Sequence, residues 1–176
     1  PSFEKSYLKV KGESKLRARL FVSASGSSGT LAAGDYLKEQ LNTKIAVVEA
    51  TECPTLLNNG YGEHNIQGIG DKHVPLIHNV MNTDFVVGIS DESTDNLNII
   101  FNTEIGHKFL ENRKGLNSDL IKKLPEFGFS TIANILASIK LAKYLKLGPE
   151  DAVITVATDG ADLYLSELNK AVKGFN

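Results

Sequence analysis

Four short apolar runs, each continuous rather than alternating with polar residues, set the strongest limit on how this chain of 176 residues can fold. They lie at Arg19–Ala24, Lys44–Ala50, Asp84–Ser90 and Asp151–Thr158. Strands that are apolar on both faces are typical of parallel sheets that helices cover on both sides. The sequence therefore predicts four buried, parallel strands.

Helical patterns separate these runs, at Thr30–Leu41, Ser93–Asn112 and Ser130–Leu147. In the last span isoleucines and leucine recur at helical spacing, and Gly148-Pro149 is expected to stop the helix. Alternation of strand and helix predicts an α/β fold with right-handed crossovers. We expect a three-layer sandwich, with a mostly parallel sheet flanked by helices, and a single domain over residues 1–176.

The composition of the chain argues against several classes of protein. Hydrophobic residues make up 41% of the chain and the formal net charge is −2, which excludes a disordered chain and gives no basic surface for nucleic acid. No apolar run approaches the roughly 18 residues that span a bilayer, and the charged N-terminus does not resemble a signal peptide. The single cysteine, Cys53, allows no internal disulfide and fits a cytoplasmic location. The histidines match no zinc-ligand spacing, so no metal site is expected.

One turn stands out, the stretch SASGSSGT at Ser23–Thr30, where the first strand leads into a helix. Glycines let successive backbone N–H groups point the same way, and the helix that follows adds its N-terminal N–H groups and its dipole. Such a nest binds an anion, most often phosphate. The alternative is a tight turn with a serine N-cap, because the stretch is neither a dinucleotide fingerprint nor a P-loop.

Further segments of the sequence narrow the interpretation of what this turn binds. In chain order they are GSSGT with LAAGDYLKEQ, KIAVVEATECPTLLNNG, HNIQGIGDKHVP, FVVGISDES, GFSTIANILASIKLAKYL and AVITVATDGADLY. Together they resemble, in the same order, the phosphate loop and later core segments of the cysteine synthase and cystathionine β-synthase family.

The resemblance implies a fold-type II pyridoxal-phosphate enzyme, of which this chain would be the large C-terminal domain of the tryptophan synthase β-like fold. Such enzymes carry out β-replacement or β-elimination on a serine or cysteine derivative, a small-molecule amino-acid substrate, and are dimeric. The residues that it implies for holding pyridoxal 5′-phosphate are Gly26, Ser27, Ser28, Gly29 and Thr30 around the phosphate, and Gly68, Ile69 and Gly70 near the cofactor face.

The end of the last strand departs from the family. There a serine meets the pyridine nitrogen, and the matching position here is Gly160, which has no hydroxyl. Two alternatives stay open. Asp159 turns inward and its carboxylate favours a protonated ring nitrogen, or Asp159 caps a turn and Gly160 offers only its backbone.

The catalytic lysine is missing. In the family the Schiff-base lysine lies in the N-terminal half, in an S-x-K-x-R setting, whereas ESKLRARL at Glu13–Leu20 has a different spacing and Lys72 has the character of a surface lysine. We therefore expect no catalytic residue here. The chain is predicted to be the C-terminal portion of a longer enzyme, inactive without the N-terminal half, and either homodimeric or associated with that half. The alternative is a non-catalytic α/β module that binds a phosphate ligand or a partner protein.

Overall fold

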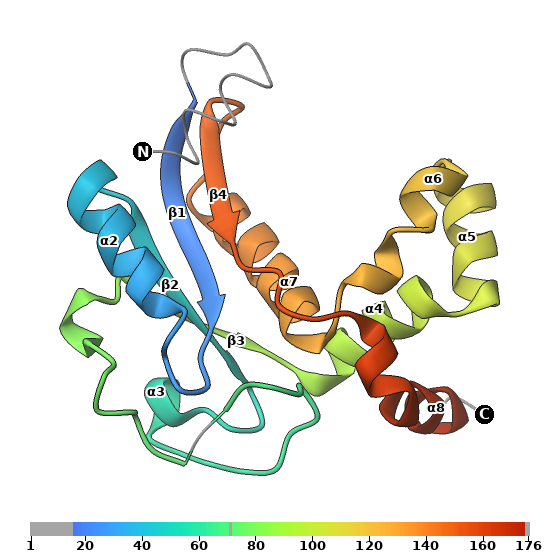
Figure 1. The fold of residues 1–176 in the computed structure, drawn as a ribbon, viewed down its shortest axis with the longest axis horizontal. Coiled ribbons are helices and arrows are strands. Elements are labelled where there is room, and N and C mark those ends of the chain that lie inside the picture. The colour runs from blue at the N-terminus through green and yellow to red at the C-terminus, as the bar shows by residue number, and fades with distance from the viewer. Residues whose placement is uncertain (1–15, 71, 175–176) are drawn as a thin grey trace.

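The computed structural model describes residues 16–70 and 72–174, and Figure 1 shows their fold. Four strands form one sheet in the order β3-β2-β1-β4, and every neighbouring pair is parallel. The strands are β1 (Arg17–Ala24), β2 (Lys44–Ala50), β3 (Phe85–Ile89) and β4 (Asp151–Thr155). The predicted parallel sheet is confirmed.

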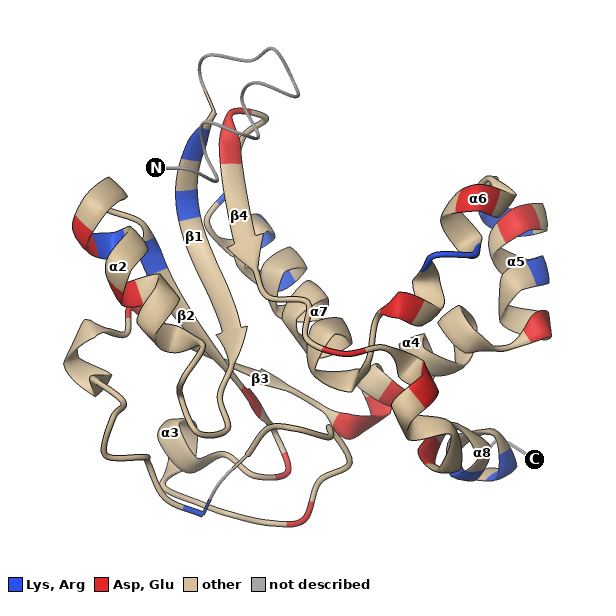
Figure 2. Ribbon diagram, viewed as in Figure 1, with Lys and Arg blue, Asp and Glu red and all other residues tan. Residues whose placement is uncertain are grey.

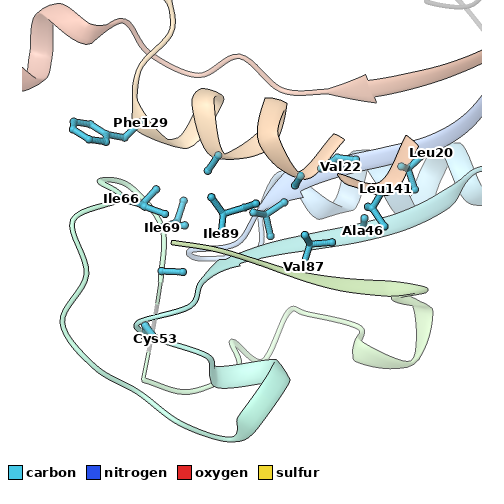
Figure 3. Close-up of a cluster of buried hydrophobic side chains, with 14 residues drawn as sticks. Leu20, Val22, Ala46, Cys53, Ile66, Ile69, Val87, Ile89, Phe129 and Leu141 are labelled. Atoms are coloured by element: carbon cyan, nitrogen blue, oxygen red, sulfur yellow. The ribbon is translucent and has the colours of Figure 1, made fainter. Parts of the chain in front are cut away.

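Helices cover the sheet on both faces, because successive side chains of each strand point to opposite sides. On one face α7 (Phe129–Tyr144) packs on Leu20, Val22, Ala46 and Val48 through a stripe that includes Phe129, Ala133, Ala137 and Leu141, as Figure 3 shows. On the other face Leu31 of α2 (Leu31–Leu41) packs on Ile45 and Val47. These layers confirm the predicted three-layer α/β sandwich.

A second, smaller lobe extends from the sheet (Figure 1). Its helices are α4 (Asp91–Asn102), α5 (Glu104–Lys114) and α6 (Ser118–Ile121), and α8 (Leu165–Gly174), which the sequence patterns did not predict, contacts α4. Leu110, Ile121 and Leu124 form an apolar cluster within this lobe. The remaining short elements are α3 (Thr55–Asn58) and the 3₁₀ turns η1 (Val80–Asn82), η2 (Leu124–Glu126) and η3 (Ala161–Tyr164).

The predicted helix Ser93–Asn112 is wrong as a single element. The chain leaves the helix at Thr103, which has extended backbone angles and caps α5 by accepting a hydrogen bond from the Gly106 N–H at 3.0 Å. A Cβ on Gly106 would lie 2.3 Å from the Ile100 carbonyl oxygen. Only a glycine allows α5 to fold back so closely on α4, and a helical periodicity does not reveal such a corner.

Two predicted ends also differ. β4 stops at Thr155, three residues earlier than expected. α7 stops at Tyr144 because Lys146 adopts a left-handed conformation (φ 52°), so the helix ends before Gly148. The first part of the ESKLRARL segment, including Lys15, lies outside the described residues. In the described part of the chain, no helix has both the length and the apolar character needed to cross a bilayer.

Candidate anion-binding site

The site lies where β1 and β4 separate. The connections from β1 and to β4 run to opposite sides of β1, which makes this the topological switch point of the sheet, the place where open α/β sheets bind ligands. β1 and β4 are paired as far as Val22 and Thr155, and the Thr155 hydroxyl donates to the Val22 carbonyl at 2.7 Å. Beyond this point the two segments bond to α7 instead of to each other.

A cavity of about 100 Å³ opens at the separation. A single water molecule needs only about 10–15 Å³, so the space accepts a larger guest. The residues that line it are Ser23, Ala24, Gly26, Ser27, Ser28, Gly29, Thr30, Gly68, Asn134 and Thr158. The structure therefore brings all five predicted phosphate-loop residues and one residue of the glycine loop to the same cavity.

Backbone donors supply the chemistry of the turn. Among the described residues, no protein acceptor takes the backbone N–H of any residue from Gly26 to Thr30, whereas the Ser25 N–H donates to the Val48 carbonyl and the Leu31 N–H to the Ser28 carbonyl. Consecutive N–H groups without a protein partner next to a cavity form an anion nest. The Thr30 side chain leaves the helix start uncapped, because its hydroxyl is 2.7 Å from that of Ser23.

The electrostatics of the cavity come from dipoles. Every lining residue is uncharged, and Figure 2 shows no acidic or basic colour on the turn between β1 and α2. The N-terminus of α2 carries the positive end of the helix dipole, worth about 0.3–1 kcal/mol to a nearby anion and up to roughly 2 in a partly buried setting. With no carboxylate in the lining to oppose it, this dipole favours a negatively charged ligand.

Ser28 is the unusual residue of the turn. It is buried, its φ is +67°, and its hydroxyl lies 3.1 Å from that of Ser25. The left-handed region costs an L-residue roughly 1–2 kcal/mol. The hydroxyl pair thus holds a backbone conformation that glycine adopts without strain.

Because of this strain, the usual order of stability of alanine and glycine variants should be reversed at Ser28. Ser28→Ala and Ser28→Gly both lose the hydroxyl, but only alanine keeps the strain. We expect Ser28→Gly to have a free energy of unfolding about 1 kcal/mol higher than Ser28→Ala. Urea denaturation measures it. At Thr30, whose φ is −69°, the same pair of substitutions should follow the opposite order. A Ser28→Ala variant at least as stable as the Ser28→Gly variant would contradict the prediction.

The glycine loop lies directly against this turn. The Gly70 N–H donates to the Ser25 carbonyl at 2.9 Å, and a Cβ on Gly26 would lie 3.1 Å from the Gly68 carbonyl oxygen. Gly68 and Gly70 have φ of +81° and +86°. Ile69 between them points into the main core instead of the cavity. The loop therefore supports the phosphate turn from outside, and only Gly68 lines the cavity.

Two carboxylates of α4 hold the segment that leads into this loop. Asp91 accepts a hydrogen bond from the Asn65 N–H at 2.6 Å, and Asp95 accepts one from the Asn65 side-chain amide at 3.0 Å. Burial raises the pKa of both carboxyls, and neighbouring acids, among them Glu52, add to the rise. Figure 2 shows acidic residues gathered where α4 begins.

Asp159 and Gly160 do not line the cavity. The Asp159 carboxylate accepts hydrogen bonds from the hydroxyls of Tyr164 and Thr158, and its carbonyl accepts the Gly128 N–H at 2.8 Å. The Tyr164 hydrogen bond to Asp159 is the main reason why the pKa of this tyrosine is raised to about 12. Asp159 thereby holds the chain between β4 and η3, and the hydroxyl that reaches the cavity lining belongs to Thr158.

Ser23, Asn134 and Thr158 also line the cavity and are not among the residues predicted to form the site. Thr158 lies two residues before Gly160, the position that the resemblance matched to the family's serine. Nothing near Asn134 in the sequence indicates its role, because its partners are 110 and 22 residues away.

The remaining polar candidates lie elsewhere. Cys53 is buried in the main core. His78 lies 3.0 Å from the Thr83 hydroxyl, and burial lowers its pKa. Lys72 is exposed over the ring of Tyr61. Among residues 16–70 and 72–174, no group of three or more His, Cys, Asp and Glu side chains could hold a metal ion.

A parallel sheet flanked by helices on both faces, with a cavity at its switch point, defines the class: an α/β domain with a candidate anion-binding site. Comparison with known proteins then gives its relatives. The chain is 32% identical over 149 residues to cysteine synthase B of Campylobacter jejuni, a match that covers 84% of this chain and 42% of that protein. The chain is related to the cysteine synthase family of fold-type II pyridoxal-phosphate enzymes, and it corresponds to a C-terminal part of them. No family model matches it.

Solved structures agree with this relationship. A hydrogen sulfide-producing enzyme from Fusobacterium nucleatum matches with a TM-score of 0.68 and 26% identity, over 92% of this chain and 43% of that one. An O-acetylserine-dependent cystathionine β-synthase from Helicobacter pylori matches with a TM-score of 0.64 and 27% identity, over 89% and 45%. The chain thus spans less than half the length of the relatives it matches.

Proposed function

We propose that this chain is the cofactor-phosphate-binding half of a pyridoxal-phosphate-dependent enzyme of the cysteine synthase type. The observation that carries the proposal is that Gly26–Thr30 line a cavity with no charged lining residue, while among the described residues no protein acceptor takes their backbone N–H groups. When bound, the cofactor supplies an electron sink for the substrate carbanion. The whole enzyme would act on a serine or cysteine derivative by β-replacement or β-elimination.

The residues of the chain take distinct parts in this proposal. The amides of Gly26–Thr30 and the start of α2 bind the phosphate. Gly68 forms the wall opposite the turn, and its lack of a side chain leaves that wall open. We assign the Thr158 hydroxyl, in place of Gly160, to face the ring nitrogen, since Thr158 lines the cavity and is fixed by Ser130 at 2.7 Å and by Asp159 at 2.9 Å.

The lysine that attaches the cofactor would come from an N-terminal half, as would strands that add to an edge of this sheet. On this view the chain is inactive alone, and a homodimer of the complete enzyme is part of the proposal. The alternative is a non-catalytic phosphate-binding module. The two proposals differ in what they expect of the N-terminal half. If this chain is part of an enzyme, that half should carry an S-x-K-x-R sequence.

Two measurements on this chain test the proposal. The dipole of a helix N-terminus contributes at most about 2 kcal/mol, whereas micromolar affinity requires roughly 8 kcal/mol. Calorimetry should therefore show pyridoxal phosphate binding that is weaker than micromolar and competed by inorganic phosphate. Borohydride trapping followed by peptide mapping should give scattered, substoichiometric lysine labelling. Stoichiometric labelling of one lysine such as Lys72 would contradict the proposal that the attaching lysine lies in an N-terminal half. Absence of competition by inorganic phosphate would contradict phosphate binding at Gly26–Thr30.

A further inference from the structure

Asn134 is the residue that keeps the switch point open. It lies in the second turn of α7 and is only 1% exposed. Its side-chain oxygen accepts the Ala24 N–H at 2.7 Å, and its side-chain nitrogen donates to the Val156 carbonyl at 3.0 Å. One amide therefore bonds to both diverging segments, the end of β1 and the chain beyond β4.

These two bonds replace a strand–strand ladder. Up to Val22 and Thr155 the backbones of β1 and β4 pair directly. Further along each strand, the Ala24 donor and the Val156 acceptor bond to Asn134 and not to each other. Both bonds are partly buried. A fully buried backbone group that lacks a partner costs roughly 1–3 kcal/mol, so a side chain that supplies both a donor and an acceptor stabilises the separated strands.

Neighbouring residues of α7 continue the same arrangement. The Thr131 hydroxyl accepts the Thr158 N–H at 3.2 Å, and the Ser130 hydroxyl lies 2.7 Å from the Thr158 hydroxyl. Both side chains are buried. The chain beyond β4 is thus bonded to the first turns of α7.

We propose that Asn134 is a positioning residue for the anion site: by holding β1 and the segment after β4 apart, it sets the width of the cavity and the direction of the amides that follow Ala24. This inference rests on the proposed phosphate site. It assigns Asn134 no contact with the reacting atoms. Its effect reaches the ligand through the Ala24 peptide, two residues before Gly26.

The test uses inorganic phosphate and the amide signals of Gly26–Thr30 in NMR spectra of this chain. Asn134→Leu keeps a similar volume and removes both hydrogen bonds. We expect at least tenfold weaker phosphate affinity and faster hydrogen exchange of the Ala24 amide. The matched control is Asn98→Leu, because Asn98 is equally buried, lies on α4 and does not line the cavity. That variant should alter stability and leave the phosphate-induced shifts unchanged.

A measurement on the unmodified chain covers the case in which the Asn134→Leu variant does not fold. Phosphate should slow exchange of the Ala24 amide more than exchange of the Phe21 amide, which lies in the paired part of β1. Equal slowing at both amides, or unchanged phosphate affinity in a folded Asn134→Leu variant, would overturn the role of Asn134. Absence of any phosphate-induced shift at Gly26–Thr30 in the unmodified chain would overturn the phosphate site itself, so the two failures are distinguishable.

Discussion

Gly26→Val is expected to abolish phosphate binding by this chain. A Cβ at this position would lie 3.1 Å from the Gly68 carbonyl oxygen and 3.7 Å from the Ile69 Cα, and both are backbone atoms of a loop that is itself bonded to Ser25. The two branches of valine need more room still, so the turn must move away from the loop. The amides of the nest then no longer converge, and we expect phosphate-induced NMR shifts to vanish, with a stability loss of about 1–3 kcal/mol.

Two smaller substitutions separate crowding from a general effect of adding a side chain to the turn. Gly26→Ala should weaken phosphate binding partially, since one methyl group requires a shift of only a few tenths of an ångström. Gly29→Ala is the matched control: its Cβ would meet only the Ser27 hydroxyl, at 3.8 Å, an ordinary contact. Equal phosphate affinity in the Gly26→Val variant and the unmodified chain would remove the assignment of this turn.

Phe129→Ala is expected to have the largest effect on stability, a loss of about 3–5 kcal/mol in the free energy of unfolding. Phe129 is fully buried at the start of α7, packs its ring edge-on against Tyr164 with centroids 5.4 Å apart, and lies in the main core with Ile66 and Ile69 (Figure 3). Its removal would leave a cavity where α7, the glycine loop and the chain after β4 meet.

Urea denaturation checks this value, with Ile139→Ala as control. Ile139 lies on the same helix but is 49% exposed, so its truncation should cost no more than about 0.5 kcal/mol. If the Phe129→Ala variant is too unstable to study, Phe129→Leu should still fold and cost roughly 1–2 kcal/mol. A Phe129→Ala variant that loses no more than the ~1 kcal/mol of a typical substitution would show that this contact is not a main source of stability.

Local patterns predicted the layers correctly because each layer depends on its own residues. The run at Lys44–Ala50 is apolar on both faces, and residues on opposite faces of that strand pack against α7 and α2. The composition of the Ser23–Thr30 turn likewise requires no distant partner to suggest an anion nest. Among the described residues no protein acceptor takes the N–H groups of Gly26–Thr30, and the anion nest itself stays a prediction.

Features that depend on contacts outside a single helix or strand were not predictable in the same way. The corner at Thr103 exists because Gly106 packs against Ile100, a contact that a helical period does not encode. The early end of β4 follows from the hydrogen bonds of Asn134 and Thr131, which a continuous apolar run to Val156 conceals. After this early end the chain follows α7, where the Thr158 N–H donates to the Thr131 hydroxyl, and Thr158 instead of Gly160 lines the cavity.

The donors of the anion nest belong to the main chain, and this has a consequence for how the site can change. A peptide N–H has no pKa in the working range of a protein, so the nest itself keeps its donors from acid to alkaline pH, and any pH dependence of binding must come from the ligand or from residues outside the lining. No side-chain truncation removes these donors either. Truncating the hydroxyl side chains of the turn would therefore understate the site, which shows itself instead through substitutions such as Gly26→Ala or Gly26→Val that change backbone shape.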